Sequence, residues 1–492
     1  MNLDLKLQKH AEHRPESPAI GWDTGELTYR QLNERIQKLA NRFMERGIGP
    51  GDKVAIILEN SPELVISYYA SMRAGVINVP VNPSLASREF GVILNDCRPK
   101  LIITEIKIVE KVKNSGLDWP VELIVTGPDF DRYIDQGGAA PGNHYQEDCT
   151  ILYTSGTTGV PKGAVLTHDN LYINADVFGR NLGLTDRDRT LIVAPLTHIA
   201  AQSNLLNPTL ISGGYCYLLK RWKSTVETLG KMEKKRITYF FGPPTMITYI
   251  LNEPALVDYD LKLRLTYTGA APLPEEIFQR WTERFGFEIV EGYGLTETSP
   301  VVCMNPAVGK KKLRSVGLPI EDVQVKIMSE GFEEVPPGTP GELVVKGPNV
   351  MKGYYKREEE NRKAFRDGWF KTGDVAMKDD EGYIYIIDRK KDLIIRSGFN
   401  VYPREVEEVL YMHPAILEAA VIGTPHPEKG ETVVAVLTLR DGYGESVVEK
   451  LEHFCRERLA SYKVPSEFRV VAEFPKTNSG KIMKAKLKEV MV

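Results

Sequence analysis

Residues 150–168 read Thr-Ile-Leu-Tyr-Thr-Ser-Gly-Thr-Thr-Gly-Val-Pro-Lys-Gly-Ala-Val-Leu-Thr-His, an apolar run typical of a β-strand that opens into a loop rich in glycine, serine and threonine. Gly156, Gly159 and Gly163 allow backbone N–H groups to approach a ligand closely. The ammonium group of Lys162 adds a positive charge that suits an anion. We therefore predict a phosphate-binding loop. Its hydroxyl donors are Thr154, Ser155, Thr157 and Thr158.

The spacing of this loop excludes the two commonest nucleotide-binding fingerprints. A P-loop requires serine or threonine after its lysine, whereas Gly163 follows Lys162 here, and no G-x-G-x-x-G occurs in the chain. A P-loop motor and a Rossmann dehydrogenase are therefore disfavoured. Taken alone, the loop is equally well explained as a solvated, turn-rich linker.

The size and composition of the chain limit the classes of protein to consider. A length of 492 residues predicts two or three domains. A net charge of -3 with 26% charged residues lacks the basic surplus of a nucleic-acid binder. The five cysteines form no C-x-x-C pair, so neither a disulfide framework nor a zinc knuckle is indicated. No secretory signal and no apolar run of membrane-spanning length occurs, and we predict a cytoplasmic protein without integral membrane association.

Apolar runs alternate with amphipathic helical stretches along the first half of the chain. Helical spacing of apolar residues covers 32–43 and about 62–74. Buried strands connected by crossover helices explain this alternation, so we predict an α/β fold. The predicted strands cover residues 54–58, 76–80, 101–104, 123–126, 191–194 and 215–219.

The second half of the chain changes character twice. Between residues 323 and 343, apolar and polar residues alternate between Pro/Gly clusters, which predicts antiparallel β structure. After Asp388, a helix at 403–412, strands at 419–422 and 433–439 and a helix at about 445–459 follow one another. These roughly 100 residues are enough for a small independent α+β domain.

Five motifs occur in one order along the chain. After residues 153–163 come Tyr-Gly-Leu-Thr-Glu-Thr at 293–298, Gly-Trp-Phe-Lys-Thr-Gly-Asp at 368–374, Asp-Arg-Lys-Lys-Asp at 388–392 and Pro-Lys-Thr-Asn-Ser-Gly-Lys at 475–481. Together they resemble the signature motifs of the adenylate-forming superfamily of acyl-CoA synthetases, carrier-protein adenylation domains and beetle luciferases. The resemblance implies a large N-terminal region, residues 1–389, with βαβ layers and a β-barrel-like subdomain. It also implies a small mobile C-terminal domain, residues 390–492.

The resemblance implies an enzyme that activates a carboxylic acid with ATP and then transfers the acyl group to coenzyme A. Charge that builds on the α-phosphorus must be absorbed by preorganised donors and a metal. Glu297 matches the Mg²⁺ ligand, a hard oxygen donor, and Thr296 matches the group facing the α-phosphate. Asp374 matches the carboxylate that binds the ribose hydroxyls, and Arg389 the guanidinium beside it. The adenine-binding walls match Gly269, Ala270, Ala271, Glu291, Gly292 and Tyr293.

The resemblance also assigns roles to the C-terminal residues. Lys481 matches the catalytic lysine that bridges the carboxylate and the α-phosphate during adenylation. Lys391 occupies the hinge position, where many relatives carry aspartate. Rotation about this hinge is expected to present Ser397 and Gly398 to the pantetheine arm of coenzyme A.

The acid itself is less well determined. His198 among apolar neighbours is by default a core histidine, but the resemblance places it at the acyl pocket. Acetate-specific relatives carry tryptophan at the position of Gly294, so the glycine favours a medium- or long-chain fatty acid, with an aryl acid as the alternative. The sequence also leaves open a stand-alone enzyme that loads a carrier protein, a luciferase-like reaction and a nucleotide-binding regulator without catalysis. The oligomeric state is not predicted.

Overall fold

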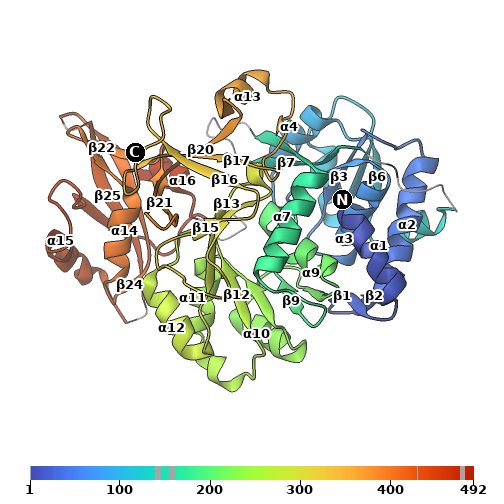
Figure 1. Cartoon of the computed structure of the whole chain (residues 1–492), viewed down its shortest axis with the longest axis horizontal. Coiled ribbons are helices and arrows are strands. Elements are labelled where there is room, and N and C mark those ends of the chain that lie inside the picture. Colours follow the sequence, from blue (N-terminus) through green and yellow to red (C-terminus); the bar gives the residue numbers. More distant parts are fainter. Residues whose placement is uncertain are drawn as a thin grey trace.

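The computed structural model describes residues 2–138, 144, 146–154, 161–428, 430–440, 442–476 and 482–491, with the backbone alone for 490 and 491. Its described part contains four β-sheets with helices packed around them (Figure 1). The mixed α/β architecture, with a large N-terminal region and a small C-terminal one, agrees with the prediction.

The first sheet has seven strands in the order β18-β8-β7-β4-β3-β5-β6. The strands from β7 to β6 are parallel, whereas β8 is antiparallel to both of its neighbours, β7 and β18. Every residue of β4 and β5 is buried, as expected for parallel strands covered on both faces. The strands are β3 (Lys53–Ile57), β4 (Ile77–Pro80), β5 (Leu101–Thr104), β6 (Glu122–Val125), β7 (Asp148–Thr154), β8 (Lys162–Thr167) and β18 (Gly353–Tyr354).

The second sheet has nine strands in the order β15-β14-β13-β12-β11-β9-β10-β1-β2. The six from β13 to β1 are parallel, so their carboxyl ends share one edge. The strands are β1 (Pro18–Trp22), β2 (Gly25–Thr28), β9 (Arg189–Ile192), β10 (Tyr215–Leu218), β11 (Tyr239–Phe241), β12 (Leu265–Thr268), β13 (Val290–Gly294), β14 (Val301–Met304) and β15 (Leu318–Pro319).

Helices cover both sheets. The predicted helix at residues 32–43 lies within α2 (Tyr29–Glu45), whose N-terminus is closed by a capping box of Thr28 and Gln31. The one predicted at about 62–74 is α3 (Pro62–Arg73). Further helices include α1 (Leu3–His13), α4 (Ser87–Cys97), α7 (His168–Asn181), α9 (Asn207–Ile211), α10 (Thr225–Lys234), α11 (Pro244–Asn252) and α12 (Glu275–Phe285).

A third, antiparallel sheet follows in the chain and corresponds to the β structure predicted from residue 323 onward. Its strands are β16 (Gln324–Met328), β17 (Gly341–Lys346), β19 (Phe365–Arg366), β20 (Trp369–Lys378) and β21 (Ile384–Arg389), with α13 (Glu358–Ala364) beside them. One apolar core, which includes Phe241, Val301 and Leu343, is continuous through all three sheets.

The fourth sheet belongs to the C-terminal region, drawn in orange to red in Figure 1. The chain leaves β21 at Arg389 and enters this sheet at Ile394. Its apolar cores contain residues from 394 onward only. Its elements are β22 (Ile394–Arg396), β23 (Phe399–Val401), α14 (Pro403–Tyr411), β24 (Ile416–His426), β25 (Gly430–Leu439), α15 (Val448–Arg456), β26 (Glu467–Val470) and α16 (Lys484–Met491).

Candidate functional site

The ends of the predicted phosphate loop are held by a β-hairpin. Thr154, the last residue of β7, pairs with Lys162, the first residue of β8, and the Thr154 hydroxyl lies 3.5 Å from the Lys162 carbonyl oxygen. The remaining predicted loop residues lie outside the described part of the chain. They are Ser155, Gly156, Thr157 and Thr158.

Beside this hairpin lies Glu297, the predicted metal ligand. The Tyr354 hydroxyl donates a hydrogen bond of 2.8 Å to Glu297 Oε1, and the Lys162 ammonium lies 5.5 Å from the centre of the Tyr354 ring. Tyr354 reaches this position because β18 pairs with β8. Tyr354 was not predicted from the sequence, because its short strand has no periodic pattern. The Lys162 ammonium, which suits a phosphate, therefore lies close to Tyr354 and to the Glu297 carboxylate that Tyr354 binds.

The surroundings of Glu297 fit Mg²⁺ held mainly by a substrate. Mg²⁺ in nucleotide enzymes is usually bound through one or two carboxylates, substrate phosphates and water. Among the described residues, no group of three or more His, Cys, Asp or Glu side chains could hold a metal. Glu297 lies in the 3-10 turn Thr296–Thr298, which also carries the predicted α-phosphate contact Thr296. This arrangement therefore offers a bound metal one carboxylate, that of Glu297, and leaves the other ligands to substrate phosphates and water.

One predicted adenine wall directly follows β12, and the other lies within the neighbouring strand β13. Gly269, directly after β12, approaches β13 so closely that an added Cβ would lie 2.9 Å from the Gly292 carbonyl oxygen. A Cβ on Gly292 would lie 2.1 Å from the Tyr267 hydroxyl. Ala270 has a φ of +67°, in the left-handed region that alanine rarely adopts, and the half-buried Ala271 follows it. The close approach of the two walls therefore requires glycine at residues 269 and 292.

Glu291 is a buried carboxyl group between these walls and the C-terminal region. Its Oε1 accepts a hydrogen bond of 3.3 Å from the Leu273 N–H. Burial raises the pKa of Glu291 to about 7, although the positive charge of Arg404 on α14 opposes this shift. Glu291 therefore changes charge near neutral pH.

The predicted ribose ligand Asp374 is 4% exposed and is held from two sides. The Tyr293 hydroxyl donates a hydrogen bond of 2.5 Å to Asp374 Oδ2. Arg389 Nε lies 3.4 Å from Asp374 Oδ1, because the two residues are opposite each other on β20 and β21. Burial raises the pKa of the Tyr293 hydroxyl, and the neighbouring Asp374 charge acts in the same direction. The tyrosine is therefore a hydrogen-bond donor at neutral pH.

His198 lies at the edge where the first and second sheets meet. Asn60, three residues beyond β3, donates to the carbonyls of Ala194 and Leu219 and accepts from the Leu196 N–H at 2.8 Å. These contacts fix the loop that leads from β9 to His198. Burial lowers the pKa of His198, and no described residue hydrogen-bonds its ring. The imidazole is therefore neutral at pH 7.

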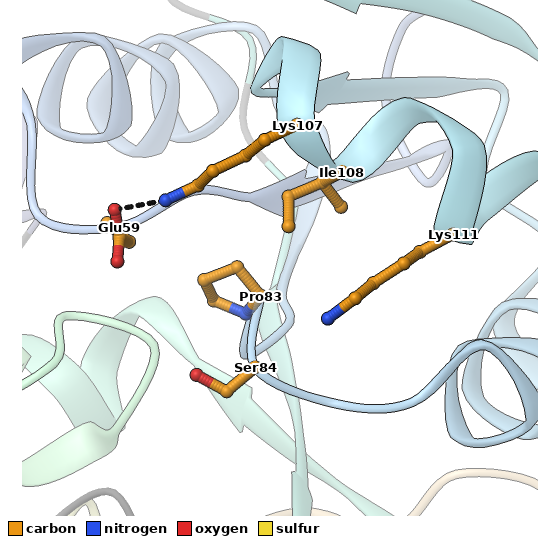
Figure 2. A pocket seen from close by; sticks show the side chains of 6 residues that line it. All are labelled: Glu59, Pro83, Ser84, Lys107, Ile108 and Lys111. Carbon is orange, nitrogen blue, oxygen red and sulfur yellow. Dashed lines mark hydrogen bonds and ion pairs between the residues drawn. The ribbon is translucent and has the colours of Figure 1, made fainter.

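A surface pocket of about 310 Å³ lies beside this junction, at the carboxyl ends of β3, β4 and β5 (Figure 2). Its Lys107 ammonium is 2.5 Å from Glu59 Oε2 and 3.2 Å from Glu105 Oε2. Lys111 has no carboxylate partner among the described residues and donates weakly to the Leu85 carbonyl at 3.4 Å. Because carboxylates neutralise Lys107, we assign this pocket no role in the site.

The predicted C-terminal residues are distributed over two places. Lys391 is exposed in the turn after β21. Ser397 and Gly398, with φ of +51° and +83°, form the exposed two-residue turn between β22 and β23. Lys481 lies outside the described residues. Its neighbour in sequence, Lys476, contacts the Tyr249 hydroxyl on α11 at 3.1 Å.

A buried charged group joins the last strand of the third sheet to the C-terminal region. Asp388 accepts hydrogen bonds from the N–H groups of Arg389 and Arg404 at 2.7 and 3.0 Å. Lys484 on α16 is 2.7 Å from Glu407. Although burial opposes it, the charges of Glu407 and Asp388 raise the pKa of Lys484. This polar joint, which was not predicted from the sequence, includes Asp388 in the last strand before the predicted hinge.

Comparisons with known proteins identify the family of this chain. Residues 7–355 match the family model described as AMP-binding enzyme, and residues 405–481 match the AMP-binding enzyme C-terminal domain. A feruloyl-CoA synthase of Amycolatopsis sp is 38% identical over 98% of this chain and 97% of its own. A long-chain-fatty-acid–CoA ligase of Bacillus subtilis (strain 168) is 36% identical over 99% and 94%. The crystal structure of the anthranilate CoA ligase AuaEII with anthranoyl-AMP has a TM-score of 0.94 at 28% identity, over 100% and 97%.

The chain therefore belongs to the AMP-binding enzyme family, within the adenylate-forming superfamily. It is an acid–thiol ligase that uses ATP and coenzyme A, as its relatives' acyl- and aryl-CoA ligase activities indicate. None of the described helices is both apolar enough and long enough to cross a lipid bilayer.

Proposed function

We propose that this enzyme joins a carboxylic acid larger than acetate to coenzyme A in two steps at one site. First, a carboxylate oxygen attacks the α-phosphorus of ATP, the bond to the bridging oxygen breaks, and pyrophosphate leaves. Next, the sulfur of coenzyme A attacks the carbonyl carbon of the acyl-AMP, AMP leaves, and the thiol proton passes to solvent. The buried Asp374, held by Tyr293 and Arg389, carries this proposal, because two oxygens fixed from opposite sides suit a pair of ribose hydroxyls.

The proposed roles of the other residues follow from their positions. Lys162 attracts the phosphates, and Thr296 faces the α-phosphate from the turn that carries Glu297. Bound Mg²⁺, held by Glu297 and the phosphates, would neutralise charge on the leaving pyrophosphate. The neutral His198 orients the carboxylate of the acid. Tyr354 fixes one oxygen of Glu297 and leaves Oε2 for a metal.

We further propose that the C-terminal region, residues 390–492, rotates about Lys391 between the two steps. Lys476 on the segment before Lys481 already contacts α11 of the larger region, which suits a conformation for adenylation. In this conformation the hairpin with Ser397 and Gly398 is exposed, together with the large apolar side chains of Ile395 and Phe399. Exposed apolar residues of this size favour a second position in which they are covered.

The class of acid stays a proposal. The names of the relatives support both the fatty acid that the sequence predicts and its aryl alternative. Gly294 gives weaker support for a wide pocket than the sequence suggested, because a Cβ there would lie 2.0 Å from the Pro300 carbonyl oxygen. Backbone packing alone thus explains this glycine, whatever the width of the pocket. The proposal that the acid is larger than acetate therefore rests on the relatives more than on Gly294.

A panel of acids tests the proposed function. Fatty acids of different lengths and aryl acids would be offered with ATP and Mg²⁺, and the release of AMP measured with and without coenzyme A. We expect pyrophosphate exchange with at least one acid, and AMP release that depends on coenzyme A. Exchange without turnover on coenzyme A would favour a carrier-protein thiol as acceptor, and absence of exchange with every acid would refute adenylation.

A further inference from the structure

The side chain of Lys476 bridges the two regions of the enzyme. Its ammonium donates a hydrogen bond of 2.8 Å to Glu418 Oε2 on β24, within the C-terminal region. It donates another, of 3.1 Å, to the Tyr249 hydroxyl oxygen on α11 of the larger region. The ammonium also lies 5.6 Å from the centre of the Tyr249 ring. Figure 1 shows α11 at the border with the C-terminal region, and Lys476 therefore has one partner on each side of this border.

The contact with Glu418 holds the lysine within its own region. Glu418 is 8% exposed, and Lys476 is its one ion-pair partner in the described part of the chain. A carboxylate at this depth is costly without a counter-charge, so Lys476 stays beside it in any position of the C-terminal region. Although burial opposes it, the hydrogen bonds with Glu418 and Tyr249 raise the pKa of Lys476. The ammonium is therefore charged at neutral pH.

Tyr249 presents its hydroxyl from a firmly held helix. Ile247 and Ile250 on α11 are fully buried in an apolar core of the larger region, whereas Tyr249 is exposed. The hydroxyl of Thr268, the last residue before the predicted adenine wall, donates a hydrogen bond of 2.8 Å to the Gly242 carbonyl, just before this helix. The position of Tyr249 is thus tied to the nucleotide wall, because both are fixed to the second sheet.

The segment around Lys476 also leads to the predicted catalytic lysine. Lys476 and Ile482 pair in an isolated antiparallel bridge, and the Met483 N–H donates to the Pro475 carbonyl at 2.8 Å. Lys481, which lies outside the described residues, immediately precedes Ile482 in the sequence. A contact that positions Lys476 therefore also positions Ile482, the residue next to Lys481.

The proposed rotation about Lys391 affects the two partners of Lys476 differently. Glu418 belongs to the C-terminal region and moves together with Lys476, whereas Tyr249 stays with the larger region. A rotation that withdraws Lys481 from the nucleotide therefore breaks the hydrogen bond to Tyr249 and keeps the ion pair with Glu418. The contact with Tyr249 thus belongs to one conformation only.

We propose that Tyr249 is a positioning residue for the adenylation half-reaction. Its hydroxyl holds Lys476 and, through the bridge to Ile482, the segment that delivers Lys481 to the carboxylate and the α-phosphate. During thioester formation the contact is broken, so Tyr249 has no part in that step. This inference rests on the proposed function, because it requires that Lys481 acts in adenylation and that the C-terminal region then rotates.

Two substitutions and their combination test this role. Tyr249→Phe keeps the ring and removes the hydrogen-bond acceptor, and Lys476→Met keeps the length of the side chain and removes its charge. We expect Tyr249→Phe to slow acyl-AMP formation, measured by pyrophosphate exchange, about fivefold to tenfold, and Lys476→Met to slow it at least as much. Thioester formation from preformed acyl-AMP should change less than about twofold in Tyr249→Phe. In the Lys476→Met background, Tyr249→Phe should have no further effect, because the contact is already lost.

Matched controls and contrary outcomes complete this test. Tyr443→Phe and Lys450→Met, at exposed residues of the C-terminal region, should leave both half-reactions unchanged. The inference would be overturned by an unchanged exchange rate in Tyr249→Phe, by equal losses in both of its half-reactions, or by losses that multiply in the double variant. Absence of exchange by the wild-type enzyme with every acid would instead refute the proposed function itself.

A cross-link tests the same contact independently of its strength. All five native cysteines are buried, so Tyr249→Cys combined with Lys476→Cys supplies one accessible pair of thiols for a bis-maleimide. The cross-linked enzyme should form acyl-AMP and lose thioester formation by about tenfold or more, because the C-terminal region can no longer rotate. The same double variant without the reagent is the control. Thioester formation at the control rate after complete cross-linking would show that the contact need not break, contrary to the inference.

Discussion

The first three sheets and the fourth sheet are held together in opposite ways. The first three share one apolar core, in which residues from distant parts of the chain are almost inaccessible to solvent. The fourth keeps its own cores and meets the rest largely through polar contacts, such as Arg440 with Glu276 at 3.3 Å and Lys476 with Tyr249. An apolar core resists separation, whereas ion pairs can exchange for water at little cost. This difference favours the proposed rotation of the C-terminal region as a unit against a rigid remainder.

The largest expected effect comes from the residue that the mobile region delivers. Lys481→Ala should lower the rate of acyl-AMP formation by about a thousandfold, because it removes the ammonium that stabilises charge in that step. Thioester formation from preformed acyl-AMP should be spared. Pyrophosphate exchange and a coupled thioester assay measure the two steps, with the exposed Lys486→Ala as control. Equal loss in both assays would mean that Lys481 contributes to both half-reactions, contrary to this prediction.

Next in size is the hinge between the two regions. Lys391→Pro should restrict the backbone rotation and slow one half-reaction about tenfold or more relative to the other. Lys391→Ala, which keeps the freedom of the backbone, should change neither step by more than about twofold. Single-turnover measurements of each half-reaction report the effect. Unchanged overall turnover in the proline variant would place the hinge elsewhere.

An effect on stability, and not on rate, is expected from the buried carboxyl group of Glu291. Because burial raises the pKa of Glu291 from 4.5 to about 7, the folded protein binds more protons than the unfolded one between these values, and stability falls as pH rises through this window. The melting temperature of Glu291→Gln relative to that of the wild type should therefore rise between pH 5 and pH 8. The corresponding gain in the free energy of unfolding is at most about 3 kcal/mol. The exposed Glu283→Gln should show no such gain. A difference that does not vary with pH would contradict the assignment.

The smallest effect is expected at the surface of the interface. Arg440→Ala removes the partly exposed ion pair with Glu276, and pairs of this kind contribute up to about 1 kcal/mol. The ratio of the two half-reaction rates should change by less than about fivefold and less so in high salt. Lys363→Ala, which breaks a pair within α13, should leave the ratio unchanged. A large change in this ratio would show that the Arg440–Glu276 ion pair alone, and not a set of contacts across the interface, holds the C-terminal region in this conformation.

Local signals in the sequence predicted much of the fold. The strand predicted at 101–104 is β5 with the same bounds, because four consecutive apolar or β-branched residues are all buried. The strand predicted at 191–194 begins two residues too late, since Arg189 and Thr190 at its start are polar. Strands β12 and β13, which hold the nucleotide walls, were not predicted as strands, because they are short and β13 contains glycines that pack against a neighbouring strand.

The site was predictable where motifs are contiguous and unpredictable where partners are distant in sequence. Glu297, Asp374 and Arg389 each lie in a motif, whereas the contact of Tyr293 with Asp374 was not predicted from the sequence. Tyr354 and Arg404 carry no such signal, because only the folded sheets bring them beside Glu297 and Asp388. The roles assigned to all these site residues remain predictions, and Lys481 and the four loop residues Ser155 to Thr158 lie outside the described part of the chain.

The close packing at Gly294 has a consequence for any attempt to change which acid this enzyme accepts. The Pro300 carbonyl occupies the space that a new side chain at residue 294 would need. A larger residue at this position alone is therefore not a way to make the enzyme accept acetate. A preference for shorter acids would instead require larger side chains on another wall of the acid-binding pocket. A relative that carries a larger residue at this position must therefore hold the backbone corresponding to Pro300 differently, a change that one substitution in this chain does not make.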